Sequence, residues 1–124
     1  MKKLLIVDDA MFMRKMIRKT MEAMGSFVIT EAVDGVEAVR IYKELQPDLV
    51  IMDITMPNKN GLEALEEIHG FDPNARVIMC SAIGQEPMIA QALTLGALDF
   101  IVKPFKTDEL TRVVGHYLLD EGDD

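Results

Sequence analysis

The sequence predicts an α/β fold in which a five-stranded parallel sheet carries helices on both faces. Two observations support this prediction. Five short apolar runs alternate along the chain with five segments of helical periodicity, so a strand and a helix follow one another five times. The apolar runs are also too uniformly apolar for a strand with one face in water, which indicates burial on both faces. The predicted strands cover residues 4–7, 27–32, 49–52, 75–80 and 98–102.

The predicted helices rest on apolar residues three and four positions apart and on capping residues at their ends. The first helix is expected from Met11 to Met24 and ends at Gly25. Asp34 and Glu37 resemble a capping box and open the second helix, which stops before Pro47. The positions expected to face the core in the second to fifth helices are Val36, Val39, Tyr42 and Leu45; Leu62, Leu65 and Ile68; Met88, Ile89, Ala92 and Leu93; and Leu110, Val113, Val114, Tyr117 and Leu118.

The length of 124 residues and the apolar content of 49% fit a single domain, placed at residues 1–120, followed by an acidic tail at residues 121–124. The 13 basic and 21 acidic residues give a net charge of −8, which argues against direct binding to nucleic acid. No apolar run approaches the ~20 residues of a membrane helix, and no signal peptide is recognisable. The single cysteine, Cys80, is expected in the core and excludes an internal disulfide. We expect a cytoplasmic monomer.

Polar residues stand at the ends of four predicted strands. Asp8 and Asp9 follow the first strand, Asp53 the third, Ser81 the fourth and Lys103 the fifth. A five-stranded doubly wound sheet commonly takes the order 2-1-3-4-5, as in flavodoxin, and binds its ligand at the switch point between strands one and three. The three acids end those two strands, so their carboxylates are expected to converge, with Lys103 beside them.

Three neighbouring carboxylates repel one another unless cations neutralise them. The candidate ligands are all oxygens, and His69 and His116 are expected at the surface away from this edge, so Mg²⁺, with Mn²⁺ as a substitute, is favoured over zinc. Mg²⁺ often couples carboxylates to phosphate oxygens, which makes Asp53 a candidate nucleophile toward a phosphoryl group. Mg²⁺ and Lys103 would neutralise the phosphoryl oxygens, and Ser81 offers a hydroxyl to a third oxygen.

Each residue also has an ordinary structural interpretation when it is taken alone. Asp9 could be a helix N-cap, Asp53 a loop cap, Lys103 a solvated strand end and Ser81 a turn residue. The combination favours a functional anionic site, because four apolar strands end on polar residues at one edge. The sequence lacks the glycine-rich dinucleotide turn, the Gly-x-x-x-x-Gly-Lys-Ser/Thr phosphate loop and the Gly-x-Ser-x-Gly elbow.

Four motifs at these strand ends are specific as a set. They are Val7-Asp8-Asp9; Asp53 with Met56-Pro57 and Gly61; Ser81-Ala82; and Lys103-Pro104-Phe105. From about residue 3 to residue 119 the chain resembles the receiver domain of two-component response regulators, and most closely the stand-alone chemotaxis regulators of thermotogal and Gram-positive bacteria. The resemblance implies a flavodoxin-like (βα)5 receiver fold.

The resemblance also implies roles for the acids. Asp53 would be the phosphoacceptor, and it would receive its phosphoryl group from the phosphohistidine of a histidine kinase. Asp9 and Asp53 would bind Mg²⁺ directly, with the backbone carbonyl of Thr55 as a third ligand. Asp8 would hold the metal through water.

The remaining site residues would contact the phosphoryl group or respond to it. Lys103 would contact it, and the bond between Lys103 and Pro104 is similar to one that is usually cis in the family. Ser81 would supply the switch hydroxyl. Phe100 stands where many chemotaxis regulators have a switch tyrosine, so its ring could swing inward but could not make a phenolic hydrogen bond.

The implied function is that of a signalling protein, with at most self-phosphorylation from small phosphodonors and self-dephosphorylation. Its partners would be a chemotaxis histidine kinase of the CheA type, the flagellar motor switch protein and a dedicated phosphatase. Output would use the face made by the fourth helix, the fifth strand and the fifth helix. Three alternatives stay open: a phosphorelay intermediate in another pathway, a haloacid-dehalogenase-like phosphatase, although Thr55 stands where that family wants an acid, and a scaffold with a vestigial site.

Overall fold

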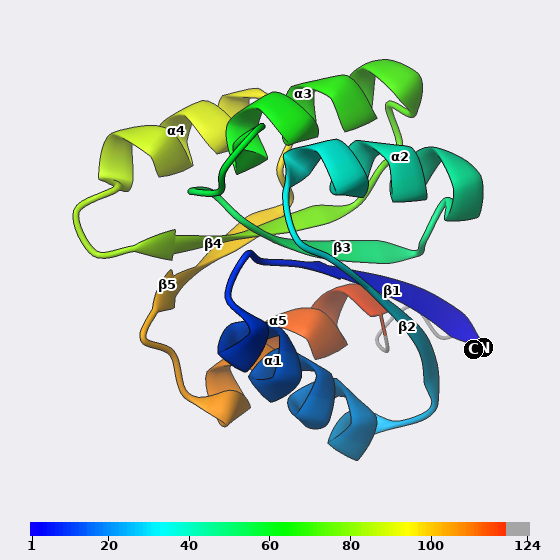
Figure 1. The fold of residues 1–124 in the computed structure, drawn as a ribbon. Helices are drawn as coiled ribbons and strands as arrows, with labels where there is room; N and C mark the ends of the chain where they lie inside the picture. Colours follow the sequence, from blue (N-terminus) through cyan, green and yellow to red (C-terminus); the bar gives the residue numbers. More distant parts are fainter. Residues whose placement is uncertain (119–124) are drawn as a thin grey trace.

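The computed structural model describes residues 1–118, in which strands and helices alternate (Figure 1). The elements are β1 Lys2–Val7, α1 Met11–Met24, β2 Phe27–Ala32, α2 Gly35–Leu45, β3 Leu49–Asp53, α3 Gly61–Phe71, β4 Val77–Ala82, α4 Glu86–Thr94, β5 Asp99–Lys103 and α5 Thr107–Leu118. The predicted acidic tail at residues 121–124 lies outside the described residues.

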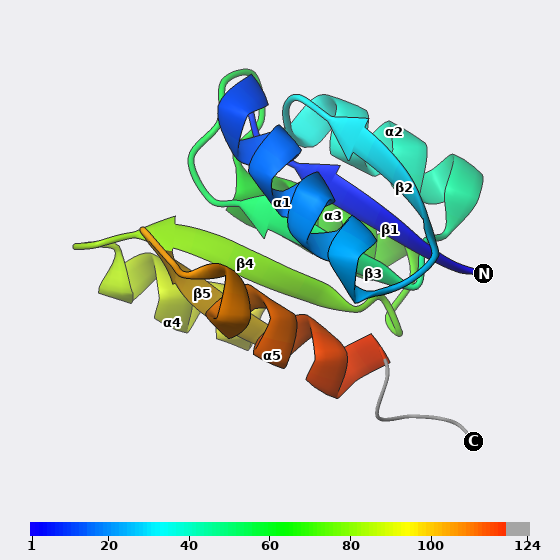
Figure 2. The same ribbon diagram turned by 90° about the horizontal axis from the view of Figure 1, so that it is seen from below.

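The strands form one parallel sheet in the order β2-β1-β3-β4-β5. Helices α2, α3 and α4 cover one face, and α1 and α5 cover the other (Figures 1 and 2). The predicted fold class and strand order are therefore confirmed. Among the described residues, no helix combines the length and the apolar content that crossing a bilayer requires.

The core has two layers because side chains alternate across each buried strand. All five residues of β3 are buried. Leu49 and Ile51 pack with α1 and α5, whereas Val50 and Met52 pack with α2, α3 and α4. Cys80 is buried in the first of these layers, as predicted, and burial raises the pKa of its thiol to about 12. This thiol is therefore a core group without nucleophilic character.

The prediction of a core position is wrong for three residues. Val36, Met88 and Leu93 are 51%, 42% and 44% exposed. Val36 lies in the first turn of α2, and α4 buries only Ile89 and Ala92. A helix that packs on one side of a sheet buries a narrower stripe than its apolar residues alone suggest.

His69 is also placed differently from the prediction. It is half-buried rather than at the surface, and its Nε2 atom is buried without a hydrogen-bond partner. The ring fills the space beside Gly96, where an added Cβ would lie 2.5 Å from the imidazole. Gly96 has φ +110 and follows α4, so its lack of a side chain serves both the turn and this contact. His116 is exposed, as predicted.

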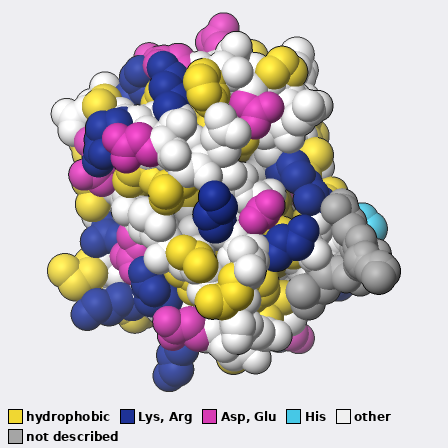
Figure 3. All heavy atoms as spheres, turned by 90° about the vertical axis from the view of Figure 1, so that its right-hand side faces the viewer, with side chains coloured by type: hydrophobic (Ala, Val, Ile, Leu, Met, Phe, Trp, Pro, Cys, Tyr) yellow, Lys and Arg dark blue, Asp and Glu magenta, His cyan; other side chains and the backbone are white. Residues whose placement is uncertain are grey.

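At the amino ends of the strands, the side chains of residues 1–118 form no block of a single charge. Figure 3 shows basic, acidic and apolar side chains intermixed there. The acids that the sequence singles out lie at the opposite, carboxyl ends of β1 and β3.

Gly61 controls how closely α3 approaches the end of β3. Its N–H donates to the carbonyl oxygen of Ile54 at 2.7 Å, and an added Cβ would lie 2.1 Å from the backbone oxygen of Asp53. A Cβ at Gly70, on the same helix, would meet nothing within 4 Å.

Gly61→Ala is therefore expected to lower the free energy of unfolding by about 1–3 kcal/mol through overpacking. Gly70→Ala is the matched control and should raise it by up to about 1 kcal/mol, because alanine favours the helix. Chemical denaturation of both variants measures this difference. Equal effects from the two substitutions would contradict the close approach at Gly61.

Candidate functional site

The carboxylates of Asp8, Asp9 and Asp53 meet at one place. β1 and β3 are parallel neighbours, with Val7 paired to Met52, so the acids that end them lie side by side. One oxygen from each carboxylate lies within 4.8 Å of the others. The prediction that these three acids converge is thus matched by their geometry, and an all-oxygen cluster fits Mg²⁺.

Asp8 is held in place by contacts to each of its polar groups. It is 1% exposed. Its Oδ1 accepts from the N–H of Ala10 at 2.9 Å, and its Oδ2 accepts from Lys103 Nζ at 2.9 Å. Its backbone N–H donates to Ala32 and its carbonyl accepts from Arg14, at 3.2 and 2.8 Å. This carboxylate is therefore fixed before any ligand binds.

Asp9, in contrast, is exposed. The N-cap of α1 is Ala10, and no side chain caps that helix. The interpretation of Asp9 as a helix N-cap is therefore wrong. Its carboxylate faces solvent within the acidic cluster, as a group that collects a cation would.

Lys103 joins the two buried acids. Its Nζ lies 2.9 Å from Asp8 Oδ2 and 3.2 Å from Asp53 Oδ2. Burial alone would lower the pKa of Lys103, but the hydrogen bond to Asp8 and the charge of Asp53 leave it raised, so this side chain is a cation at neutral pH.

Asp53 is 8% exposed and is the last residue of β3, rather than the first residue after it. Burial raises the pKa of its carboxyl group, the Lys103 ammonium lowers it, and the charge of Asp8 raises it again. The net shift is upward, so one cation does not fully compensate two buried acids. A second cation at this place would therefore stabilise the charged cluster.

Ser81 lies near the end of β4, fully buried, and its hydroxyl has no hydrogen-bond partner. It therefore does not bond the Asp53 carboxylate in this arrangement. The adjacent Cys80 packs in the layer of α1 and α5, so alternation along the strand turns Ser81 toward the layer of α4. Phe100, on β5, is 38% exposed.

The connection from β3 to α3 carries Thr55, which is exposed and lies two residues beyond Asp53. Contacts to the start of α2 fix this connection. Asn58 Nδ2 donates to Asp34 at 2.7 Å, and the N–H of Gly35 donates to the carbonyl of Lys59 at 3.0 Å. A Cβ at Gly35 would lie 2.4 Å from that carbonyl oxygen, so glycine permits the contact.

The Lys103–Pro104 peptide is cis, as the resemblance implied.

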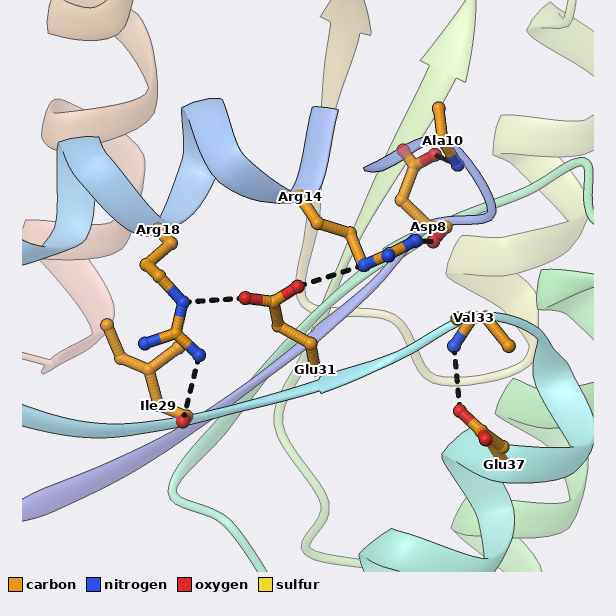
Figure 4. A network of polar contacts seen from close by, with 8 residues as sticks. All are labelled: Asp8, Ala10, Arg14, Arg18, Ile29, Glu31, Val33 and Glu37. Carbon is orange, nitrogen blue, oxygen red and sulfur yellow. Dashed lines mark hydrogen bonds and ion pairs between the residues drawn. The ribbon is translucent and has the colours of Figure 1, made fainter. Parts of the chain in front are cut away.

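The sequence interpretation missed Arg14. The Arg14 side chain is only 12% exposed and reaches from α1 back to the Asp8 carbonyl (Figure 4). Glu31 on β2 accepts from Arg14 Nε at 2.9 Å and from Arg18 Nε at 2.6 Å. The Arg18 and Arg14 contacts lower the pKa of Glu31 against the opposing effect of its burial. The residue that could have indicated this position is Glu31, an acid on β2. Only the packing of α1 against β2 shows that the two side chains meet.

Arg14→Met should weaken Mg²⁺ binding about tenfold, because residues that orient metal ligands commonly contribute at least this much. Arg18→Met is the matched control, since Arg18 shares Glu31 but has no contact with Asp8, and it should retain the wild-type affinity. Titration calorimetry with Mg²⁺ measures both. An equal loss in the two variants would assign the effect to the lost charge instead of the Asp8 contact.

The raised pKa of Asp53 destabilises the metal-free fold once the group is ionised. The native state holds this proton more tightly than the unfolded state, so the free energy of unfolding falls as pH rises from 3.8 through the raised pKa. Asp53→Asn should therefore unfold at a higher temperature than the wild type at about pH 7 without divalent ions. Added Mg²⁺ should stabilise the wild type more than the variant. A variant less stable than the metal-free wild type would contradict this electrostatic account.

Residues 4–115 match the response regulator receiver domain. The chemotaxis protein CheY of Listeria monocytogenes is 56% identical, over 92% of this chain and 96% of its own. CheY of Thermotoga maritima is 51% identical, over 91% and 94%. The solved CheX–CheY–BeF3–Mg²⁺ complex of Borrelia burgdorferi matches with a TM-score of 0.88 and 41% identity, over 93% of this chain and 87% of that one.

The observed strand order is also the one known from flavodoxin and CheY. Phosphorylation and Mg²⁺ binding at an acidic pocket are typical of the matched family, whose CheY-like members are signalling proteins rather than enzymes in the usual sense. Family match, relatives and geometry agree, and the chain belongs to the receiver domains of two-component response regulators, among those similar to CheY.

Proposed function

We propose that Asp53 accepts a phosphoryl group from a histidine kinase and that the charged product changes how the domain binds its partners. The observation that carries this proposal is the cluster of three carboxylates within 4.8 Å, with Lys103 bonded to two of them. This arrangement supports Asp53 as the nucleophile, because an ammonium group and two further carboxylates lie beside it.

In the proposed transfer, a carboxylate oxygen of Asp53 attacks the phosphorus of phosphohistidine. The new O–P bond forms as the N–P bond breaks, and the leaving imidazole takes up a proton from solvent. Lys103, held by Asp8, neutralises one phosphoryl oxygen. Bound Mg²⁺ would supply the remaining positive charge, with Asp9, Asp53 and the Thr55 carbonyl as direct ligands and Asp8 acting through water.

Ser81 is proposed as the switch hydroxyl. Its buried and unpartnered state supports this role, since the hydroxyl can gain a bond to the phosphoryl group without losing one. Phe100 is exposed in this arrangement, and it would turn into the space that Ser81 leaves. The face of α4, β5 and α5 would then change by a shift in population between two arrangements.

The names of the relatives support a role in chemotaxis. For that role we propose a histidine kinase of the CheA type upstream and the flagellar motor switch protein downstream. The Borrelia CheY is solved in complex with CheX, which supports a further chemotaxis protein as a partner. We also expect a dedicated phosphatase. We place the receiver unit at residues 1–120 and expect it to act as a cytoplasmic monomer. A phosphorelay in another pathway is the remaining alternative, and transfer from Asp53 onto a second histidine would favour it. Membership of the receiver family removes the basis for the dehalogenase-like alternative.

Incubation with Mg²⁺ and acetyl phosphate is expected to form an acid-stable, base-labile adduct on Asp53, located by mass spectrometry of peptides. Asp53→Asn and a chelator should each abolish the adduct. Asp48→Asn is the matched control, because Asp48 bonds the backbone N–H of Lys3 at the other end of the sheet. The absence of any adduct would favour a vestigial scaffold, and sustained turnover of phosphomonoesters would favour a phosphatase.

A further inference from the structure

Gln85 connects the two loops that follow Asp53 and Ser81. Its Nε2 donates to the Thr55 hydroxyl oxygen at 2.8 Å, and its Oε1 accepts from the N–H of Ala82 at 2.6 Å. The orientation of the amide is determined, because a backbone N–H requires an acceptor. We call this pair of contacts the Gln85 bridge.

The bridge binds the peptide group between Ser81 and Ala82. The N–H of Ala82 belongs to the Ser81–Ala82 peptide group, so Gln85 holds that plane directly. The backbone of Gln85 also donates to the Ala82 carbonyl at 3.2 Å and accepts from the N–H of Met88 at 2.9 Å, within the first turn of α4. The position of Ser81 and the start of α4 are thereby joined through one residue.

This arrangement favours the unphosphorylated state. The Ser81 hydroxyl bonds nothing here, and in the proposed switch it moves toward Asp53 to meet the phosphoryl group. That movement turns the Ser81–Ala82 peptide, whose N–H is bonded to Gln85, while the other end of the bridge stays on the Asp53 loop. The bridge is therefore made in this arrangement, and the proposed movement of Ser81 would break or rearrange it.

We propose that Gln85 is a positioning residue that holds Ser81 away from Asp53 and so sets how readily the site takes up and keeps a phosphoryl group. The inference rests on the proposed function, because it assigns Ser81 the switch hydroxyl. An interaction present in only one of two states shifts the population by its own strength. Two solvent-exposed hydrogen bonds correspond to about a threefold to tenfold shift.

Gln85→Met keeps the length of the side chain and removes both bonds. Without Mg²⁺, the Ala82 amide should exchange with solvent faster in this variant than in the wild type. With Mg²⁺ and beryllofluoride, a tetrahedral analogue of the phosphoryl group, the variant should bind about threefold to tenfold more tightly, and acetyl phosphate should label it faster. A role in stability alone would change the unfolding temperature without tightening this binding.

Gln91→Met is the matched control, because it makes the same substitution on an exposed position of α4, and it should bind beryllofluoride like the wild type. Thr55→Val removes only one end of the bridge and should tighten binding less. Adding it to Gln85→Met should give no further gain, because the two positions act through one interaction.

Wild-type or weaker binding of beryllofluoride by Gln85→Met, together with binding by the wild type, would overturn the role of Gln85 and leave the proposed function standing. A wild type that binds neither beryllofluoride nor a phosphoryl group would overturn the proposed function, and the role of Gln85 with it.

Discussion

The repulsion among three carboxylates at one edge of the sheet is the constraint on which the rest of this structure depends. Two of the acids are buried, and burial together with the charge of Asp8 raises the pKa of Asp53. Lys103 reduces this effect by bonding both acids. Negative charge in the cluster still remains uncompensated. This explains in physical terms why such a site collects a divalent cation and then accepts a negatively charged group.

The fold makes this concentration of charge possible. Parallel strands end at the same edge, and the crossover after β2 places β1 beside β3, so acids from distant parts of the chain become neighbours. The buried layers on both faces of the sheet hold those strand ends in place. Because Gly35 and Gly61 have no side chains, the backbone oxygens of Lys59 and Asp53 can lie close to them. The loop after Asp53 therefore packs against α2 and β3.

The polar contacts around the cluster divide into two kinds. Arg14 and Lys103 fix Asp8 from opposite sides, so this part of the site is rigid in advance. Ser81 is different, because its hydroxyl is buried without a partner, and Gln85 accepts from the N–H of the peptide group that follows it. In the proposed function, the rigid half binds charge and the half around Ser81 moves in response.

The sequence by itself determined the fold class, the strand order and the residues that stand at the strand ends. Those features follow from periodicity and from short motifs, which are local. Only the tertiary structure decided that Arg14 points to Asp8, that His69 packs against Gly96, and that Val36, Met88 and Leu93 stay exposed. It also decided that Gln85 joins the loops after β3 and β4. These features depend on which elements lie beside each other and at what distance, and helical periodicity contains no information about the neighbour that a side chain will meet.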